Sequence, residues 1–170
     1  MPSSTAQLER NALKKNAAGF SLIELLIVVA VILIIAAIAI PNFIRSKMRA
    51  NEAAAVSNMR NITTAEVVYN TTWGIGFSPD LPSLGGSPAV PDATQAGLID
   101  SVLSAGVKSG YNFTYGVLVT DANGNVQAFS INADPVAPGT TGDRHFYSDQ
   151  SSVIRQNLTG TAGPSDTPIQ

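Results

Sequence analysis

Residues 14–41 read KKNAAGFSLIELLIVVAVILIIAAIAIP, and this stretch decides the fold of the chain. Its sixteen residues 25–40 are all aliphatic or alanine. A helix that crosses a membrane needs about 20 mostly apolar residues, because each residue adds about 1.5 Å along its axis. The run 20–41 is long enough, with one serine and Glu24 as its polar residues. Since lipid offers the backbone no hydrogen-bond partners, the sequence predicts a membrane-spanning helix here.

The charges of the chain are unevenly placed. The whole chain of 170 residues has a formal charge of -2, whereas Arg10, Lys14 and Lys15 against Glu9 give the first nineteen residues +2, which leaves -4 for the rest. A basic start before an apolar segment is typical of targeting segments. The rest has no basic block, so we expect no direct nucleic-acid binding. The absence of cysteine excludes disulfides and thiolate chemistry.

Three interpretations of the apolar segment are open. A signal peptide cut near AAIAIP would have a shorter apolar run than this one. An uncleaved anchor accounts for the length but not for Glu24, because a carboxylate in mid-bilayer costs about 2.5–3.5 kcal/mol. A cut between Gly19 and Phe20 accounts for the glycine, the aromatic residue and the carboxylate together, and we favour it.

At these residues, GFSLIELLIVVAVILIIAAIAIP, the sequence resembles the type IV pilins and the related pseudopilins of type II secretion. The resemblance implies a prepilin leader, residues 1–19, that a membrane peptidase cuts after Gly19. It implies that the new N-terminal residue, Phe20, is then N-methylated. It also implies a partner for Glu24, which is the amino group of Phe20 in a neighbouring subunit of a fibre.

Pro41 lies where many members of the family carry a helix-distorting proline. A proline removes one backbone donor and clashes one turn back, so it either ends the helix or distorts it. Because a helical pattern resumes at once, we expect a distorted helix that continues over residues 42–72. This half is amphipathic, with an apolar stripe for packing on a head. The stripe consists of Ile44, Met48, Ala55, Met59, Ile62 and Tyr69, and the opposite face carries Lys47, Asn51, Asn58 and Thr64.

Residues 73–158 predict a globular head. Its first part is rich in Gly, Pro and Ser and predicts an ordered connector that Trp73 and Phe77 hold on the head. Residues 94–106 predict a short helix with Gly106 at its end.

The second part of the head predicts a small antiparallel sheet. Residues 111–120 and 125–133 read as strands, and the Asn-Gly pair between them is a strong hairpin signal. Residues 145–149 and 153–156 predict a third and a fourth strand. The last segment, residues 159–170, predicts a flexible tail.

The sequence offers little catalytic chemistry. His145 is the only histidine, and we expect it on an edge strand. No nucleophile, metal or phosphate-binding motif is evident, so we expect no enzyme activity, no cofactor and no metal. Asp121, Asn123 and Asn125 have the alternating spacing that opens a calcium loop, but no closing glutamate follows, and a hairpin turn explains them already.

Together these features indicate an α+β fold of the type IV pilin kind: a long N-terminal helix, transmembrane over residues 20–41, whose second half packs on an antiparallel sheet. The resemblance implies a structural subunit that polymerises into a type IV pilus for adhesion, motility or DNA uptake. The alternatives are a pseudopilin of type II secretion and a membrane-tethered binding module that does not polymerise.

The resemblance also implies partners and a location. The partners are identical or related pilin subunits, the prepilin peptidase and methyltransferase, an inner-membrane assembly platform with its ATPase, and membrane lipid. The precursor would cross the inner membrane once with its head outside the cytoplasm. The mature chain would then enter an extracellular pilus or a periplasmic pseudopilus.

Overall fold

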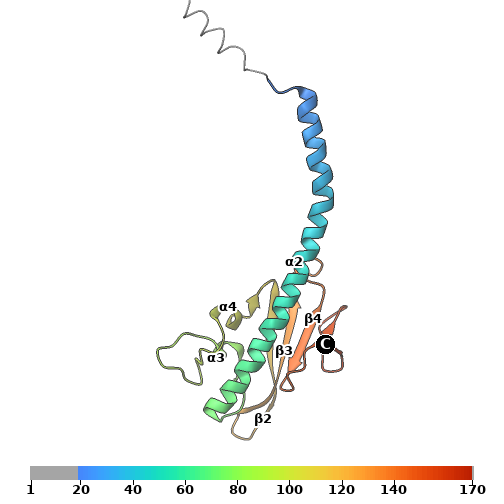
Figure 1. Ribbon diagram of the computed structural model, residues 1–170. Helices are drawn as coiled ribbons and strands as arrows, with labels where there is room; N and C mark the ends of the chain where they lie inside the picture. Colours follow the sequence, from blue (N-terminus) through green and yellow to red (C-terminus); the bar gives the residue numbers. More distant parts are fainter. Residues whose placement is uncertain (1–18, 170) are drawn as a thin grey trace, which may run out of the picture. The chain divides into compact units, whose positions relative to one another are not determined.

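The computed structural model describes residues 19–169, so the expected leader lies outside the described residues except for Gly19. The chain forms two compact units that meet in the sequence at Asn42 and Phe43 (Figure 1). The described elements are α2 (Leu22–Trp73), α3 (Leu81–Leu84), α4 (Ser101–Ser104), β1 (Val107–Lys108), β2 (Tyr111–Thr120), β3 (Val126–Pro135), β4 (His145–Asp149), β5 (Arg155–Asn157) and β6 (Thr167–Pro168).

In the first unit, the described residues form the start of α2 and their apolar side chains are exposed. The large apolar side chains from Leu22 to Ile40 are between 45% and 77% exposed. By length and composition, α2 is the one helix of the described part that could cross a membrane. The helix continues through Pro41, which confirms the predicted continuation, and the alternative that Pro41 ends it is wrong. A distortion at Pro41 stays a prediction.

In the second unit, one face of α2 is buried in the core of the head, and Figure 1 shows this part of the helix lying along the sheet. Ala55, Met59, Ile62 and Tyr69 are buried, as the predicted stripe requires. The stripe fails at its start, because Ile44 is 41% exposed.

The prediction that Asn58 faces away from the head is wrong, since this residue is buried. The contact face is wider than the apolar stripe and takes in polar positions on both sides of it. Glu52, Thr63 and Glu66 are buried on the same helix. The core of the head therefore contains carboxylates as well as apolar side chains.

The sheet is a simple antiparallel meander, with its six strands paired in the order of the sequence. The predicted hairpin is confirmed as β2 and β3, joined at Thr120 and Val126. Its turn needs Gly124, whose φ of 86° lies in the left-handed region that favours glycine. The predicted third and fourth strands are confirmed as β4 and β5.

His145 does not lie on an edge strand, contrary to the prediction. Its strand, β4, pairs with β3 on one side and β5 on the other. The imidazole Nδ1 lies against the carboxylate of Asp134 on β3. The prediction failed because the strands that cover β4 come from weak sequence signals late in the chain.

The segment 159–169 has defined structure where the sequence predicted a flexible tail. β6 pairs with β5, and Ala162 is 4% exposed. Ile169 packs against the core, and its N–H donates to the carbonyl of Ile154 over 2.9 Å. The head therefore extends beyond the predicted limit at residue 158. The backbone pairs of this segment are made with distant residues, which local composition does not reveal.

The predicted helix 94–106 is wrong in extent. Only α4 is helical, because Asp100 caps it by accepting hydrogen bonds from the N–H groups of Val102 and Leu103. The residues before it run along α3 instead, where the N–H of Ala96 donates to the carbonyl of Ser83.

The prediction for the connector is confirmed. The ring of Trp73 lies 4.8 Å from that of Tyr69, and the ring of Phe77 lies 4.8 Å from that of Phe129. Both aromatic residues are therefore packed against the core, as the sequence predicted.

Candidate functional site

The candidate site is the start of α2, where the predicted processing residues lie. Phe20 is 79% exposed, and Gly19 is exposed with no other atom within 4 Å of the place where a Cβ would stand. Among the described residues, no side chain covers the bond between them. The cut after Gly19 and the methylation of Phe20 stay predictions.

Glu24 has a local role that the sequence interpretation missed. The helix begins at Leu22, and the carboxylate of Glu24 accepts a hydrogen bond from the backbone N–H of Ser21 over 3.3 Å. This contact is one half of a capping box, in which a glutamate three positions after the cap reaches back to its N–H. The signal was available, because Ser21 and Glu24 have the S-x-x-E spacing.

The capping contact uses only part of the hydrogen-bonding capacity of the Glu24 carboxylate. A carboxylate has about four acceptor positions, and the described residues give Glu24 one donor. No basic side chain among the described residues pairs with it. The geometry therefore leaves acceptor capacity for a cationic partner from outside the chain.

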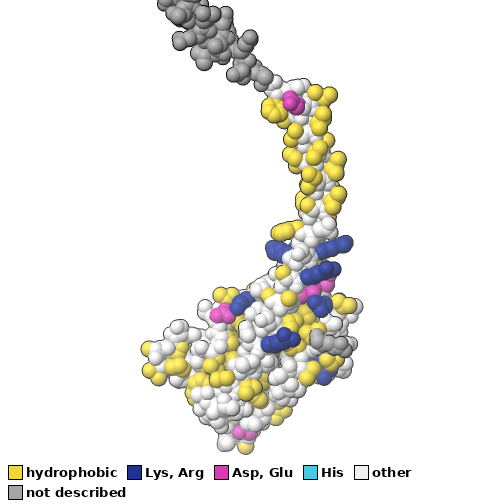
Figure 2. Space-filling model, viewed as in Figure 1, with side chains coloured by type: hydrophobic (Ala, Val, Ile, Leu, Met, Phe, Trp, Pro, Cys, Tyr) yellow, Lys and Arg dark blue, Asp and Glu magenta, His cyan; other side chains and the backbone are white. Residues whose placement is uncertain are grey.

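The large apolar side chains around this carboxylate are exposed. Figure 2 shows hydrophobic side chains along the whole described length of the first unit. Burying such surface is worth about 25 cal/mol per Å², so it stays exposed only in an isolated chain. Lipid or other apolar helices are the surroundings that suit it.

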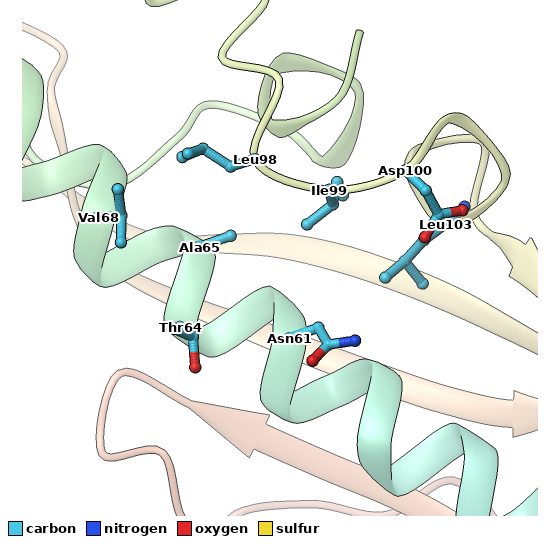
Figure 3. A pocket seen from close by; sticks show the side chains of 8 residues that line it. All are labelled: Asn61, Thr64, Ala65, Val68, Leu98, Ile99, Asp100 and Leu103. Atoms are coloured by element: carbon cyan, nitrogen blue, oxygen red, sulfur yellow. The ribbon is translucent and has the colours of Figure 1, made fainter. Parts of the chain in front are cut away.

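The head contains a groove of about 300 Å³ beside α2, drawn in Figure 3. Its lining residues are Asn61, Thr64, Ala65, Val68, Leu98, Ile99, Asp100 and Leu103. The only titratable group there, Asp100, already caps α4 and binds the ammonium group of Lys108 over 2.7 Å. The one acid of the groove is therefore already engaged within the chain.

The turn that resembles a calcium loop uses its own oxygens. The carboxylate of Asp121 accepts hydrogen bonds from the N–H of Asn123, the N–H of Asn125 and the Asn125 side-chain amide. A calcium ion would have to displace these donors. Within residues 19–169, no group of three or more His, Cys, Asp and Glu side chains is placed to hold a metal.

Glu52, in the buried half of α2, is fully paired. Its carboxylate accepts hydrogen bonds from the N–H groups of Asp143 and Arg144 and pairs with the Arg144 guanidinium over 2.8 Å. Burial by itself would raise the pKa of Glu52, but these hydrogen bonds outweigh it and lower the pKa. Glu52 thus joins α2 to the segment before β4.

Glu66 is buried without a cation. Its carboxylate accepts hydrogen bonds from the N–H and the hydroxyl of Ser78. Burial raises the pKa of Glu66, and the two hydrogen bonds offset this effect only in part. The contact joins α2 to the connector, and Tyr115 donates to the carbonyl of the same Ser78 over 2.9 Å.

Comparison with known proteins finds one family model and two similar curated proteins. The model of the prokaryotic N-terminal methylation motif matches residues 14–40. The type IV major pilin PilA of Myxococcus xanthus is 54% identical over 70 residues, which cover 36% of this chain and 32% of that protein. The type IV wide pilus major component PilA4 of Thermus thermophilus is 42% identical over 55 residues, which cover 32% of this chain and 42% of that protein.

The chain therefore spans less than half the length of the curated relatives it matches. No solved structure matches it. The fold itself agrees with the prediction, since a long N-terminal apolar helix precedes a six-stranded antiparallel sheet in an α+β arrangement. The resemblance of this chain to the type IV pilins, stated from residues 19–41, is thereby confirmed.

Proposed function

We propose that the chain is the structural subunit of a type IV pilus and polymerises through the first half of α2. The observation that carries the proposal is the exposed apolar start of α2 with one incompletely paired carboxylate, in a segment that matches the methylation motif. Both named relatives are type IV pilus components, which supports a pilus over a secretion pseudopilus.

Assembly follows from the chemistry of the start of α2. A peptidase and methyltransferase cut after Gly19 and methylate Phe20, whose amino group becomes a cation. In a fibre this cation pairs with Glu24 of a neighbouring subunit, which removes the cost of burying either charge alone. Ala36, Ala37 and Ala39 allow the helices to approach closely. Repeated in one direction, such a contact does not close, so it generates a fibre.

The remaining parts of the proposal concern location and partners. The precursor sits in the inner membrane with its head outside the cytoplasm, and an assembly platform with an ATPase supplies the work of polymerisation. The chain itself is a structural protein without enzyme activity. Adhesion, motility and DNA uptake are the uses that such a fibre serves.

The test is the yield and the N-terminus of sheared filaments. In cells that express the chain with a type IV assembly system, we expect filaments whose subunits start at N-methylated Phe20. Glu24→Ala should reduce filament yield at least tenfold while the protein still enters the membrane. Glu24→Gln separates charge from capping, because the amide oxygen still accepts the N–H of Ser21. We expect it to be as defective as Glu24→Ala.

Glu66→Gln is the matched control, since it changes a carboxylate of the same helix outside the assembly segment. Its filament yield should equal that of the wild type. A chain that remains in membranes as a monomer with residues 1–19 attached would overturn the proposal and favour the tethered binding module.

A further inference from the structure

Three basic residues without partners follow the apolar half of α2. Arg45, Lys47 and Arg49 are exposed, and none of them makes an ion pair within residues 19–169. They lie five, seven and nine positions after Ile40, the last residue of the apolar run. Figure 2 shows Lys and Arg side chains gathered at the start of the second unit, on α2.

Two of these residues open onto one cleft. Arg45 and Arg49 are four positions apart, so their side chains leave the same face of the helix. They line a cleft of about 630 Å³ with Met48, Arg144 and Leu158. Two carboxylates also line it, but both already have donors. Glu52 pairs with Arg144, and Asp143 accepts from the N–H of Gly139.

The acidic residues of the described part do not pair with Arg45, Lys47 or Arg49. Every Asp and Glu among them makes at least one hydrogen bond within the chain. Within the described residues, no side-chain hydrogen bond involves Arg45, Lys47 or Arg49. A phosphate supplies several strong acceptors for these cations. The planar guanidinium groups suit a phosphate in two-pronged contacts.

Exposed apolar side chains lie among these cations. Phe43 is 70% exposed, Ile44 41% and Leu158 68%. Long basic side chains just beyond an apolar span can extend their charged groups to the headgroup level of a membrane. At 1.5 Å per residue, Arg45 and Arg49 lie roughly 7.5 and 13.5 Å of helix past Ile40. The headgroup layer is about 5–8 Å thick on each side of the bilayer, within reach of these long side chains.

We propose that Arg45 and Arg49, assisted by Lys47, bind the phosphate of an anionic phospholipid in the cleft beside Leu158. The proposal rests on the membrane-anchored state in the proposed function. It adds a specific lipid contact that the subunit holds before assembly and must exchange when it leaves the bilayer.

Native mass spectrometry of the full chain tests this contact. The chain is released from micelles that contain equal amounts of phosphatidylglycerol and phosphatidylcholine, and the two bound lipids are counted. The wild type should retain phosphatidylglycerol at least tenfold over phosphatidylcholine. A basic residue near an anionic surface is worth about fivefold in affinity. Arg45→Gln with Arg49→Gln should therefore reduce the preference to near unity.

Arg60→Gln is the matched control, because Arg60 is another exposed arginine of α2 that makes no ion pair with the described residues and does not line this cleft. It should leave the preference unchanged, and circular dichroism should show all variants folded. An equal loss in Arg60→Gln would overturn the proposal in favour of unspecific charge attraction.

Two further results would also overturn it. In the first, the wild type shows no lipid preference, but the arginines are needed for cross-links between copies of the chain. In the second, millimolar inorganic phosphate displaces the lipid, which would make the cleft a site for small anions. A chain that enters neither micelles nor nanodiscs would contradict membrane anchoring itself, so that failure is recognisable separately.

Discussion

The two halves of α2 invert the usual relation between polarity and burial. The first half is almost wholly apolar, and its large side chains are exposed. The second half carries Glu52, Asn58 and Glu66, and all three are buried. The first half leaves its surface for surroundings outside the chain, whereas the second half buries one face in the head. The halves should therefore respond differently to the same kind of substitution.

The largest difference is expected for removal of an apolar side chain. Met59 is fully buried, so Met59→Ala should lower the free energy of unfolding of the head by about 2–5 kcal/mol. Ile32 is 57% exposed, so Ile32→Ala should leave that free energy unchanged. Thermal unfolding of the full chain in detergent, followed by the near-ultraviolet signal of Trp73, measures both. Equal destabilisation would show that the first half is part of the folded core.

A smaller effect is expected at Glu52. Glu52→Ala leaves the N–H groups of Asp143 and Arg144 without their acceptor, at a cost of about 1–3 kcal/mol. Because the folded state lowers the pKa of Glu52, its contribution is present above the ordinary value of 4.5 and is lost as the pH falls through the lowered pKa. The difference in melting temperature between the wild type and Glu52→Ala should therefore shrink in acid. A difference that grows below pH 4.5 would contradict the assigned pairing.

Glu66 should show the opposite dependence, with a still smaller effect of about 1 kcal/mol. Because the folded state raises its pKa, its contribution is complete below the ordinary value of 4.5 and is lost as the pH rises through the raised pKa. Glu66→Gln should therefore gain stability over the wild type from acid to alkaline pH. The measurement is a series of melting curves between pH 4 and 9, and a gain that is constant with pH would refute the explanation.

The sequence predicted what local patterns determine. The apolar run, the resumed helical pattern after Pro41 and the Asn-Gly turn each carry their own signal, and the helix and the β2–β3 hairpin follow from them. The acceptor contacts of Glu52 join residues more than 90 positions apart, so no local pattern contains them. The burial of Asn58 likewise depends on the width of the sheet that covers it.

The errors near the C-terminus have the same cause. β5 and β6 are three and two residues long, too short for an alternating pattern. Their pairing puts His145 on an inner strand and orders the segment up to Ile169. At the candidate site, the predicted cut between Gly19 and Phe20 stays a prediction. The capping contact of Glu24 was missed although the spacing for it was present.

The smallest effect on stability is expected at Glu24, the third carboxylate of α2. Glu24→Ala removes the acceptor for the N–H of Ser21, so the first turn should fray by about 0.5–1 kcal/mol. Amide exchange at Ser21 in micelles should then accelerate by about two- to fivefold. Glu24→Gln should restore slow exchange, because its amide oxygen accepts the same hydrogen bond, and the melting temperature of the head should not change in either variant. Slow amide exchange of Ser21 in Glu24→Ala would mean that the Glu24 carboxylate has no capping role within the chain. Glu24 would then differ from Glu52 and Glu66, which both act within one head.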